Sequence, residues 1–113
     1  MEIKKIVKDT IHLLDKRKAE DIKGIYIENK SSVADYIVLA SAANERQLGA
    51  LADEVEEFLG RKDIIPKSIE GKKESGWVLM DYRDFIVNLL TMKMREKYNI
   101  EKIWAECETV DWE

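Results

Sequence analysis

Two kinds of apolar spacing follow one another along the chain, and their order is the feature that most restricts its fold. Residues 2–17 carry apolar side chains at about every third or fourth position, as an amphipathic helix does. The same spacing returns after Asn44, and runs that are typical of strands, rich in β-branched and aromatic residues, lie before and after it. The predicted order is helix, two strands, helix, three strands, helix. This order predicts an α/β fold in which helices pack on a mixed five-stranded sheet, not a regular doubly wound sheet.

The expected strands are short, and one of them carries a proline. They span residues 22–28, 36–40, 64–69, 77–81 and 85–90. Pro66 has no backbone N–H to donate, so we expect the third strand at an edge of the sheet. Only Tyr82, Arg83 and Asp84 separate the last two strands, and so short a connection predicts an antiparallel hairpin.

Capping residues mark the ends of the later helices. Asn44 and Gln47, three residues apart, form a capping-box pattern at the start of the second helix. Gly60 follows its apolar stripe and is expected to close it. Thr91 is expected to cap the last helix, which is followed by a short helical turn.

The composition supports one domain with a mixed surface. A hydrophobic content of 45% in 113 residues suits a single core, so we expect one domain over residues 1–113 with a C-terminal tail of about 106–113. The 19 basic and 23 acidic residues give a net charge of −4, and the basic residues are not clustered. Binding to a phosphate backbone depends on clustered Lys and Arg, so direct sequence-specific nucleic-acid binding is not expected.

The location of the protein is also restricted. A single cysteine, Cys107, excludes an internal disulfide and a multi-cysteine metal site. The first residues contain no uninterrupted apolar stretch of signal-peptide length, and no run approaches the length of a membrane span. We therefore expect a cytoplasmic protein without membrane association.

Groups for catalysis are sparse. His12 and Cys107 lie at opposite ends of the chain, so no nucleophile and base are paired in a legible motif. The five glycines form no phosphate-binding loop, and no cofactor or metal is expected. The alternative function is a Mg²⁺-dependent nucleotidyltransferase-like enzyme, in which the strand-end acids Asp35, Asp81 and Asp84 hold the metal and a triphosphate.

The segment EGKKESGWVLMDY, residues 70–82, places a tryptophan where a polar loop becomes an apolar strand. Alternation along a strand puts Trp77 and Leu79 on one face and Val78 and Met80 on the other. If one pair packs on the helices, the other is exposed, and an exposed apolar pair marks a protein contact. Alternatively Trp77 covers the core, since large aromatic residues are highly buried on average. The residues alone leave both interpretations open.

Seven runs in the chain together match a known pattern. They are KAEDI at 18–22, KSSVADYIV at 30–38, RQ at 46–47, AD at 52–53, EG at 70–71, WVLMD at 77–81 and YNIEKIW at 98–104. In this order and spacing, over about residues 5–105, the chain resembles the ribosomal silencing factor family, also called Iojap-like proteins. Each run alone is a weak signal, whereas the ordered set is specific.

The resemblance implies a nucleotidyltransferase-like α/β fold without nucleotidyl transfer. It also implies a translational repressor that docks on large-subunit ribosomal protein fourteen of the L-series and keeps the two ribosomal subunits from joining. The family's contact region corresponds here to Glu70 and Gly71 together with the strand residues Trp77, Val78, Leu79 and Met80. Family proteins also self-associate, so a homodimer that hides Trp77 is a further expectation.

Three places depart from the family pattern. Residues 41–44 read SAAN where the family commonly has a run containing Thr-Gly, and Asn88 stands where it has histidine. Arg83 replaces a glycine between the last two strands. Because arginine adopts a positive φ less readily than glycine, that turn is expected to differ.

Overall fold

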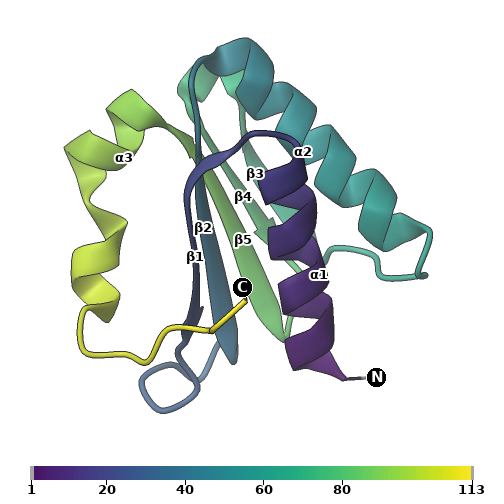
Figure 1. Cartoon of the computed structure of the whole chain (residues 1–113), viewed down its shortest axis with the longest axis vertical. Helices are drawn as coiled ribbons and strands as arrows, with labels where there is room; N and C mark the ends of the chain where they lie inside the picture. Colours follow the sequence, from purple (N-terminus) through teal and green to yellow (C-terminus); the bar gives the residue numbers. More distant parts are fainter. Residues whose placement is uncertain (1, 113) are drawn as a thin grey trace.

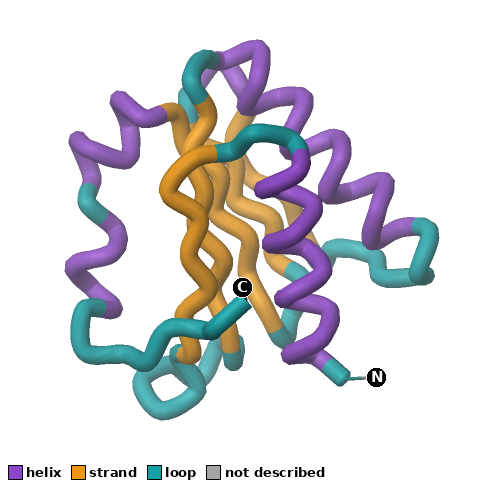
Figure 2. The backbone as a smooth tube through the Cα atoms, viewed as in Figure 1, coloured by secondary structure: helices purple, strands orange, loops and turns teal. Residues whose placement is uncertain are grey.

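A computed structural model describes residues 2–112, and its centre is a five-stranded mixed sheet with helices on both faces (Figure 1; Figure 2). The helices are α1 (Ile3–Lys16), α2 (Glu45–Gly60) and α3 (Met92–Tyr98), with two short 3₁₀ helices, η1 (Lys73–Ser75) and η2 (Ile100–Trp104). The strands are β1 (Glu20–Tyr26), β2 (Tyr36–Ala42), β3 (Ser68–Lys72), β4 (Trp77–Asp81) and β5 (Phe85–Thr91). The predicted order of elements and the predicted fold class are confirmed.

The strands lie in the order β1-β2-β5-β4-β3. The central pair, β2 and β5, is parallel, whereas the other three pairs are antiparallel. The hairpin expected between β4 and β5 is present, and β3 lies at an edge as predicted. A parallel pair needs a long crossover connection, and the segment from α2 to β4 supplies it.

Each face of the sheet has its own apolar core. Helices α1 and α2 pack on one face, where Val7 and Leu48 meet strand residues such as Val87. On the other face α3 and η2 cover a smaller cluster that includes Leu39 and Leu90. Figure 1 shows this division, with α3 on one side of the sheet and α1 and α2 on the other. Because both faces are covered, β2 and β5 are apolar almost throughout.

The two edges of the sheet differ. At the β1 edge the C-terminal segment runs beside the strand: the Val110 N–H donates to the Gly24 carbonyl at 2.7 Å, and the Tyr26 N–H donates to the Glu108 carbonyl at 2.8 Å. Val110 is buried, and a Cβ on Gly24 would lie 2.7 Å from Cδ1 of Ile11 and 3.1 Å from Cβ of Val110, so a larger residue at position 24 would require these side chains to shift. The segment expected as a tail is therefore part of the folded structure through residue 112, and position 113 lies outside the described residues.

Several expected boundaries need correction. Strand β1 spans Glu20–Tyr26 where 22–28 is predicted, and β2 continues to Ala42 where the prediction ends at 40. The sequence predicts the third strand over 64–69, but pairing with β4 begins at Ser68 and continues to Lys72. Pro66 lies in the connection before the strand, since a residue without an N–H does not join the ladder. Helix α2 ends at Gly60 as predicted, and the left-handed residue that follows it is Asp63, with φ of 60°.

The predicted caps are present. The Asn44 side chain accepts a hydrogen bond from the Gln47 N–H at 2.8 Å, and Thr91 accepts one from the Met94 N–H at 3.3 Å. Both bonds satisfy N–H groups that a helix start leaves without a partner. The starts of α2 and α3 are thus set by local sequence.

Candidate protein-docking site

Two left-handed glycines shape the loop before Trp77. Gly71 has φ of +86° and Gly76 has φ of +78°. Between them Ser75 closes η1, because its hydroxyl donates to the Lys72 carbonyl at 2.7 Å and accepts from the Lys72 N–H at 3.2 Å. The Gly71 backbone approaches β4 so closely that a Cβ there would lie 2.1 Å from the Trp77 carbonyl oxygen. This loop therefore fixes where Trp77 enters the sheet.

The structure decides which face of β4 is available to a partner. Val78 and Met80 point toward α1 and α2 and are 4% and 0% exposed. The sequence predicts them as partner-binding residues; they belong to the larger core, and their side chains also line the depression between α2 and β3 described below. Trp77 and Leu79 lie on the opposite face and are half-buried. The surface part of the predicted site is thus Trp77 and Leu79 with Glu70 and Gly71.

Trp77 is held by two partners that lie far from it in the sequence. Its indole Nε1 donates to Oδ1 of the buried Asn88 at 2.8 Å. Its ring centroid lies 5.3 Å from that of Tyr98, which is 49% exposed. One edge of the indole is therefore anchored in the sheet while the remainder lines the surface. Asn88, one of the departures from the family pattern, supplies the anchor.

Between β4 and α3 lies an apolar depression of about 460 Å³, called here the sheet-face groove. It is lined by Glu70, Gly71, Ser75, Trp77, Leu79, Met94 and Tyr98. Sequence analysis identified the β3 and β4 residues but missed Met94 and Tyr98, which reach the groove only because α3 folds back onto this face. Tyr98 opens the matched run at 98–104, whereas Met94 lies outside every matched run and gave no signal.

Arg95 fastens α3 in this position. It is buried, and its Nε donates to Oε1 of Glu101 at 2.9 Å while Nη1 donates to Oγ of Ser41 on β2 at 3.0 Å. The hydrogen bond from Arg95 lowers the pKa of the Glu101 carboxyl. Met94 and Tyr98, on the same helix, are held over β4 as a result.

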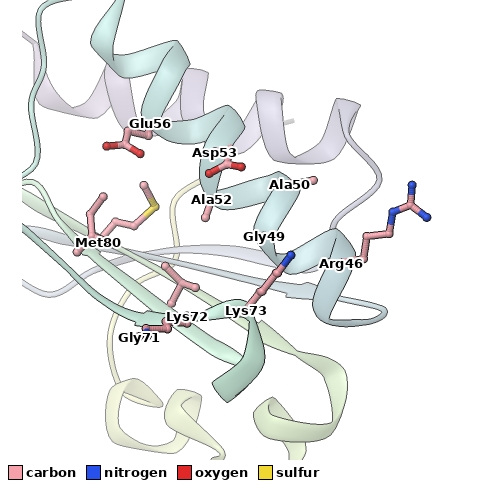
Figure 3. A pocket seen from close by; sticks show the side chains of 12 residues that line it. Arg46, Gly49, Ala50, Ala52, Asp53, Glu56, Gly71, Lys72, Lys73 and Met80 are labelled. Carbon is pink, nitrogen blue, oxygen red and sulfur yellow. The ribbon is translucent and has the colours of Figure 1, made fainter.

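A second depression of about 480 Å³, the helix-side groove, lies on the other face of the same edge, between α2 and β3 (Figure 3). Its lining includes the apolar side chains of Ala52, Ile69, Val78 and Met80. Figure 3 shows Arg46 and Lys73 toward one end of the groove and the carboxylate of Glu56 toward the other. The groove therefore combines an apolar centre with opposite charges at its ends.

The acids of the enzyme alternative occupy a different place. Asp35, Asp81 and Asp84 lie where the parallel strands β2 and β5 begin, whereas ligands of open α/β sheets bind beyond the carboxyl ends of the strands. Asp81 Oδ1 accepts the Arg83 N–H at 2.8 Å, and the Asp84 carbonyl accepts the Asp35 N–H at 2.9 Å. Among residues 2–112 no cluster of three His, Cys, Asp or Glu side chains is arranged to hold a metal ion. The Asp81 carboxylate is thus engaged in the turn after β4, and Asp35 and Asp84 are joined through their backbones where β2 and β5 begin.

The turn with Arg83 keeps a left-handed backbone. Arg83 has φ of 72°, so it adopts the left-handed conformation that glycine favours. The hairpin is closed by the Tyr82 N–H, which donates to the Phe85 carbonyl at 2.9 Å. The departure at this position therefore costs conformational strain and leaves the β4–β5 pairing intact.

The remaining groups noted in the sequence have structural contacts. His12 Nε2 lies 2.6 Å from the Trp112 carbonyl oxygen, and the two rings meet edge to face. Cys107 is half-buried against the smaller core. No helix within the described part of the chain is both long enough and apolar enough for a membrane span.

Fold and site together define a class. This is a single α/β domain in which two grooves flank the β3 edge of a five-stranded mixed sheet. The family model described as "Ribosomal silencing factor during starvation" matches residues 1–113, and the chain belongs to this family of translation regulators. The predicted resemblance is confirmed.

Similar proteins cover almost the whole chain. A curated relative from Bacillus subtilis, "Ribosomal silencing factor RsfS", is 33% identical over 111 residues, which are 98% of this chain and 94% of the relative. A crystal structure of protein CV0518 from Chromobacterium violaceum superposes with a TM-score of 0.88 at 30% identity, covering 93% of this chain and 88% of that one. A structure from Bacillus halodurans gives a TM-score of 0.82 at 27% identity, covering 95% and 97%. The fold is shared throughout.

Proposed function

We propose that this protein represses translation by binding the large ribosomal subunit and sterically preventing it from joining the small subunit. The observation that carries the proposal is the sheet-face groove, in which Trp77 and Leu79 present apolar surface beside an open sheet edge. Tryptophan anchors in partly desolvated pockets contribute disproportionately to protein binding. Family membership supports the ribosome as the target.

The partner on the subunit is large-subunit ribosomal protein fourteen. An acidic chain with a net charge of −4 suits a basic ribosomal protein, because complementary charge speeds association and disfavours wrong partners. Trp77 and Leu79 form the centre of the contact, Glu70 and Gly71 lie at its rim, and Tyr98 forms the opposite wall. The protein acts in the bacterial cytoplasm, where the ribosomes are.

A steric repressor needs no catalytic group, so the proposal includes the absence of enzymatic activity. Calorimetry with ATP, CTP or UTP and Mg²⁺ tests this directly. We expect no heat of binding. Saturable heat that is lost in Asp81→Asn would favour the nucleotidyltransferase-like alternative instead.

Co-sedimentation with purified large subunits tests the docking surface. We expect Trp77→Ala to weaken binding about 30-fold, the equivalent of the roughly 2 kcal/mol that defines a hot spot. Trp112→Ala is the matched control, since Trp112 is also half-buried but lies beside His12, away from the groove. Circular dichroism establishes that both variants are folded. Equal affinity of Trp77→Ala and wild type would show that the anchor is elsewhere.

We also propose that the protein self-associates through the same groove, as a second use of this surface. A homodimer formed through Trp77 covers the apolar side chains until the ribosome competes for them. Light scattering of the free protein over a range of micromolar concentrations measures this. A dimer that persists unchanged in Trp77→Ala would place the dimer contact outside the groove.

A further inference from the structure

The sheet has one closed edge and one open edge. The C-terminal segment hydrogen-bonds to β1 through Glu108 and Val110, so that edge is covered. Strand β3 has β4 as its one neighbour, and within residues 2–112 no segment pairs with its outer side. An open edge presents unpaired N–H and C=O groups that accept a further strand. The fold therefore leaves one template for strand addition.

Both grooves described above flank this open edge. The helix-side groove is lined by Ile69, Gly71 and Lys72 of β3, and the sheet-face groove by Glu70 and Gly71 of the same strand. Gly71 is common to both, because it has no side chain to separate them. Successive side chains of a strand point to opposite faces of the sheet. A strand added at β3 would thus direct alternate side chains toward the two grooves.

We propose that β3 receives an extended segment of the partner protein as a sixth strand, whose alternate side chains enter the helix-side and sheet-face grooves. The proposal rests on the proposed function and specifies how the partner is held. Main-chain hydrogen bonds supply affinity in such strand addition, and the flanking pockets supply specificity. It extends the contact beyond Trp77 to the backbone of β3 and to the face of α2.

The charges of the helix-side groove define the chemistry of the segment. Arg46 and Lys73 lie toward one end, and Asp53 and Glu56 lie along α2 toward the other. Ile69, which is 41% exposed, also lines the groove. The complementary segment carries an apolar side chain at its centre, an acidic residue at one end and a basic residue at the other. A basic ribosomal protein can present such a strand.

Residues just before and within β3 disfavour pairing of this edge with the same edge of a second copy. Pro66 and Lys67 precede the strand, and Glu70 and Lys72 lie within it. Proline and charged residues on an edge limit pairing between copies of one chain. The occupant is therefore a different protein, and a second copy is the competing outcome of the test.

Hydrogen–deuterium exchange of β3 separates strand addition from contact through side chains alone. The probe is purified large ribosomal subunits mixed with the full-length protein. We expect exchange of the amides within Ser68–Lys72 to slow at least 10-fold in the complex. Unchanged exchange, in a complex that still depends on Trp77, would overturn strand addition and leave the proposed function in place. No binding by the wild-type protein would overturn both.

A charge reversal provides the second readout. Glu56→Lys reverses a residue that lines the helix-side groove, and Glu57→Lys makes the same change one position away, where the carboxylate pairs with Arg61 outside the groove. We expect at least a 5-fold loss of affinity for Glu56→Lys and less than a 2-fold change for Glu57→Lys. Equal affinities would overturn the role of the groove. Protection of β3 that grows with protein concentration in free Trp77→Ala, which lacks the proposed dimer contact in the sheet-face groove, would identify a second copy as the occupant of the edge and also overturn the proposal.

Discussion

Replacing Gly71 with alanine tests how the loop positions Trp77. The new Cβ would lie 2.1 Å from the Trp77 carbonyl oxygen, and the backbone has φ of +86°. A left-handed conformation costs a non-glycine residue about 1–2 kcal/mol. Because the obstructing atom belongs to the backbone, β3 and β4 must separate locally, which adds roughly 1–3 kcal/mol. The smaller conformational freedom of alanine in the unfolded chain offsets about 0.4–1 kcal/mol.

The net expectation for Gly71→Ala is a loss of about 3 kcal/mol in the free energy of unfolding, or roughly 10–15 °C in Tm for a domain of this size. Urea denaturation followed by circular dichroism measures it. Gly60→Ala is the matched control, since a Cβ added there would meet no atom within 4 Å beyond its own stretch of helix. That variant should gain up to about 1 kcal/mol. A loss below about 1 kcal/mol for Gly71→Ala, or a gain like that of the control, would refute the steric reasoning.

Three further changes probe the strained turn, the α3 anchor and the closed edge. Arg83→Gly relieves a left-handed residue with φ of 72° and should raise the unfolding free energy by about 0.5 kcal/mol in urea titrations; a decrease would show that the arginine side chain stabilises the turn. Glu101→Gln should lower the unfolding free energy by about 1.5–3 kcal/mol at neutral pH. The hydrogen bond from Arg95 lowers the folded-state pKa of Glu101, so its contribution is present above the ordinary value of 4.5 and is lost as pH falls through the folded-state pKa. The difference between variant and wild type should therefore shrink below pH 4.5, and a constant difference would contradict this origin. Val110→Asp places a charge in a buried site on the β1 edge and should lower the unfolding free energy by about 2 kcal/mol or more. If the C-terminal segment then leaves β1, light scattering should detect association of the protein through the uncovered edge. A variant that stays a stable monomer would contradict the idea that this segment protects the edge.

The candidate site was only partly predictable. Alternation assigned Trp77 and Leu79 to one face of β4 and Val78 and Met80 to the other, but the pattern is equally apolar on both sides. Which of the two faces is covered by α1 and α2 depends on how the helices pack, and the burial of Val78 and Met80 shows that it is theirs. The contact with Tyr98 joins residues 21 positions apart. Local periodicity carries no information on such a pairing.

The sequence by itself determined the kinds of elements and their order, because periodicity, capping residues such as Asn44 and the proline before β3 act over a few residues. It also determined family membership, through an ordered set of short runs. Only the tertiary structure decided that Asn88 anchors the Trp77 indole, and that the C-terminal segment closes the β1 edge while β3 stays open. These features depend on which segments of the chain pack against the sheet and pair with its edges, and such contacts form only when the whole chain folds.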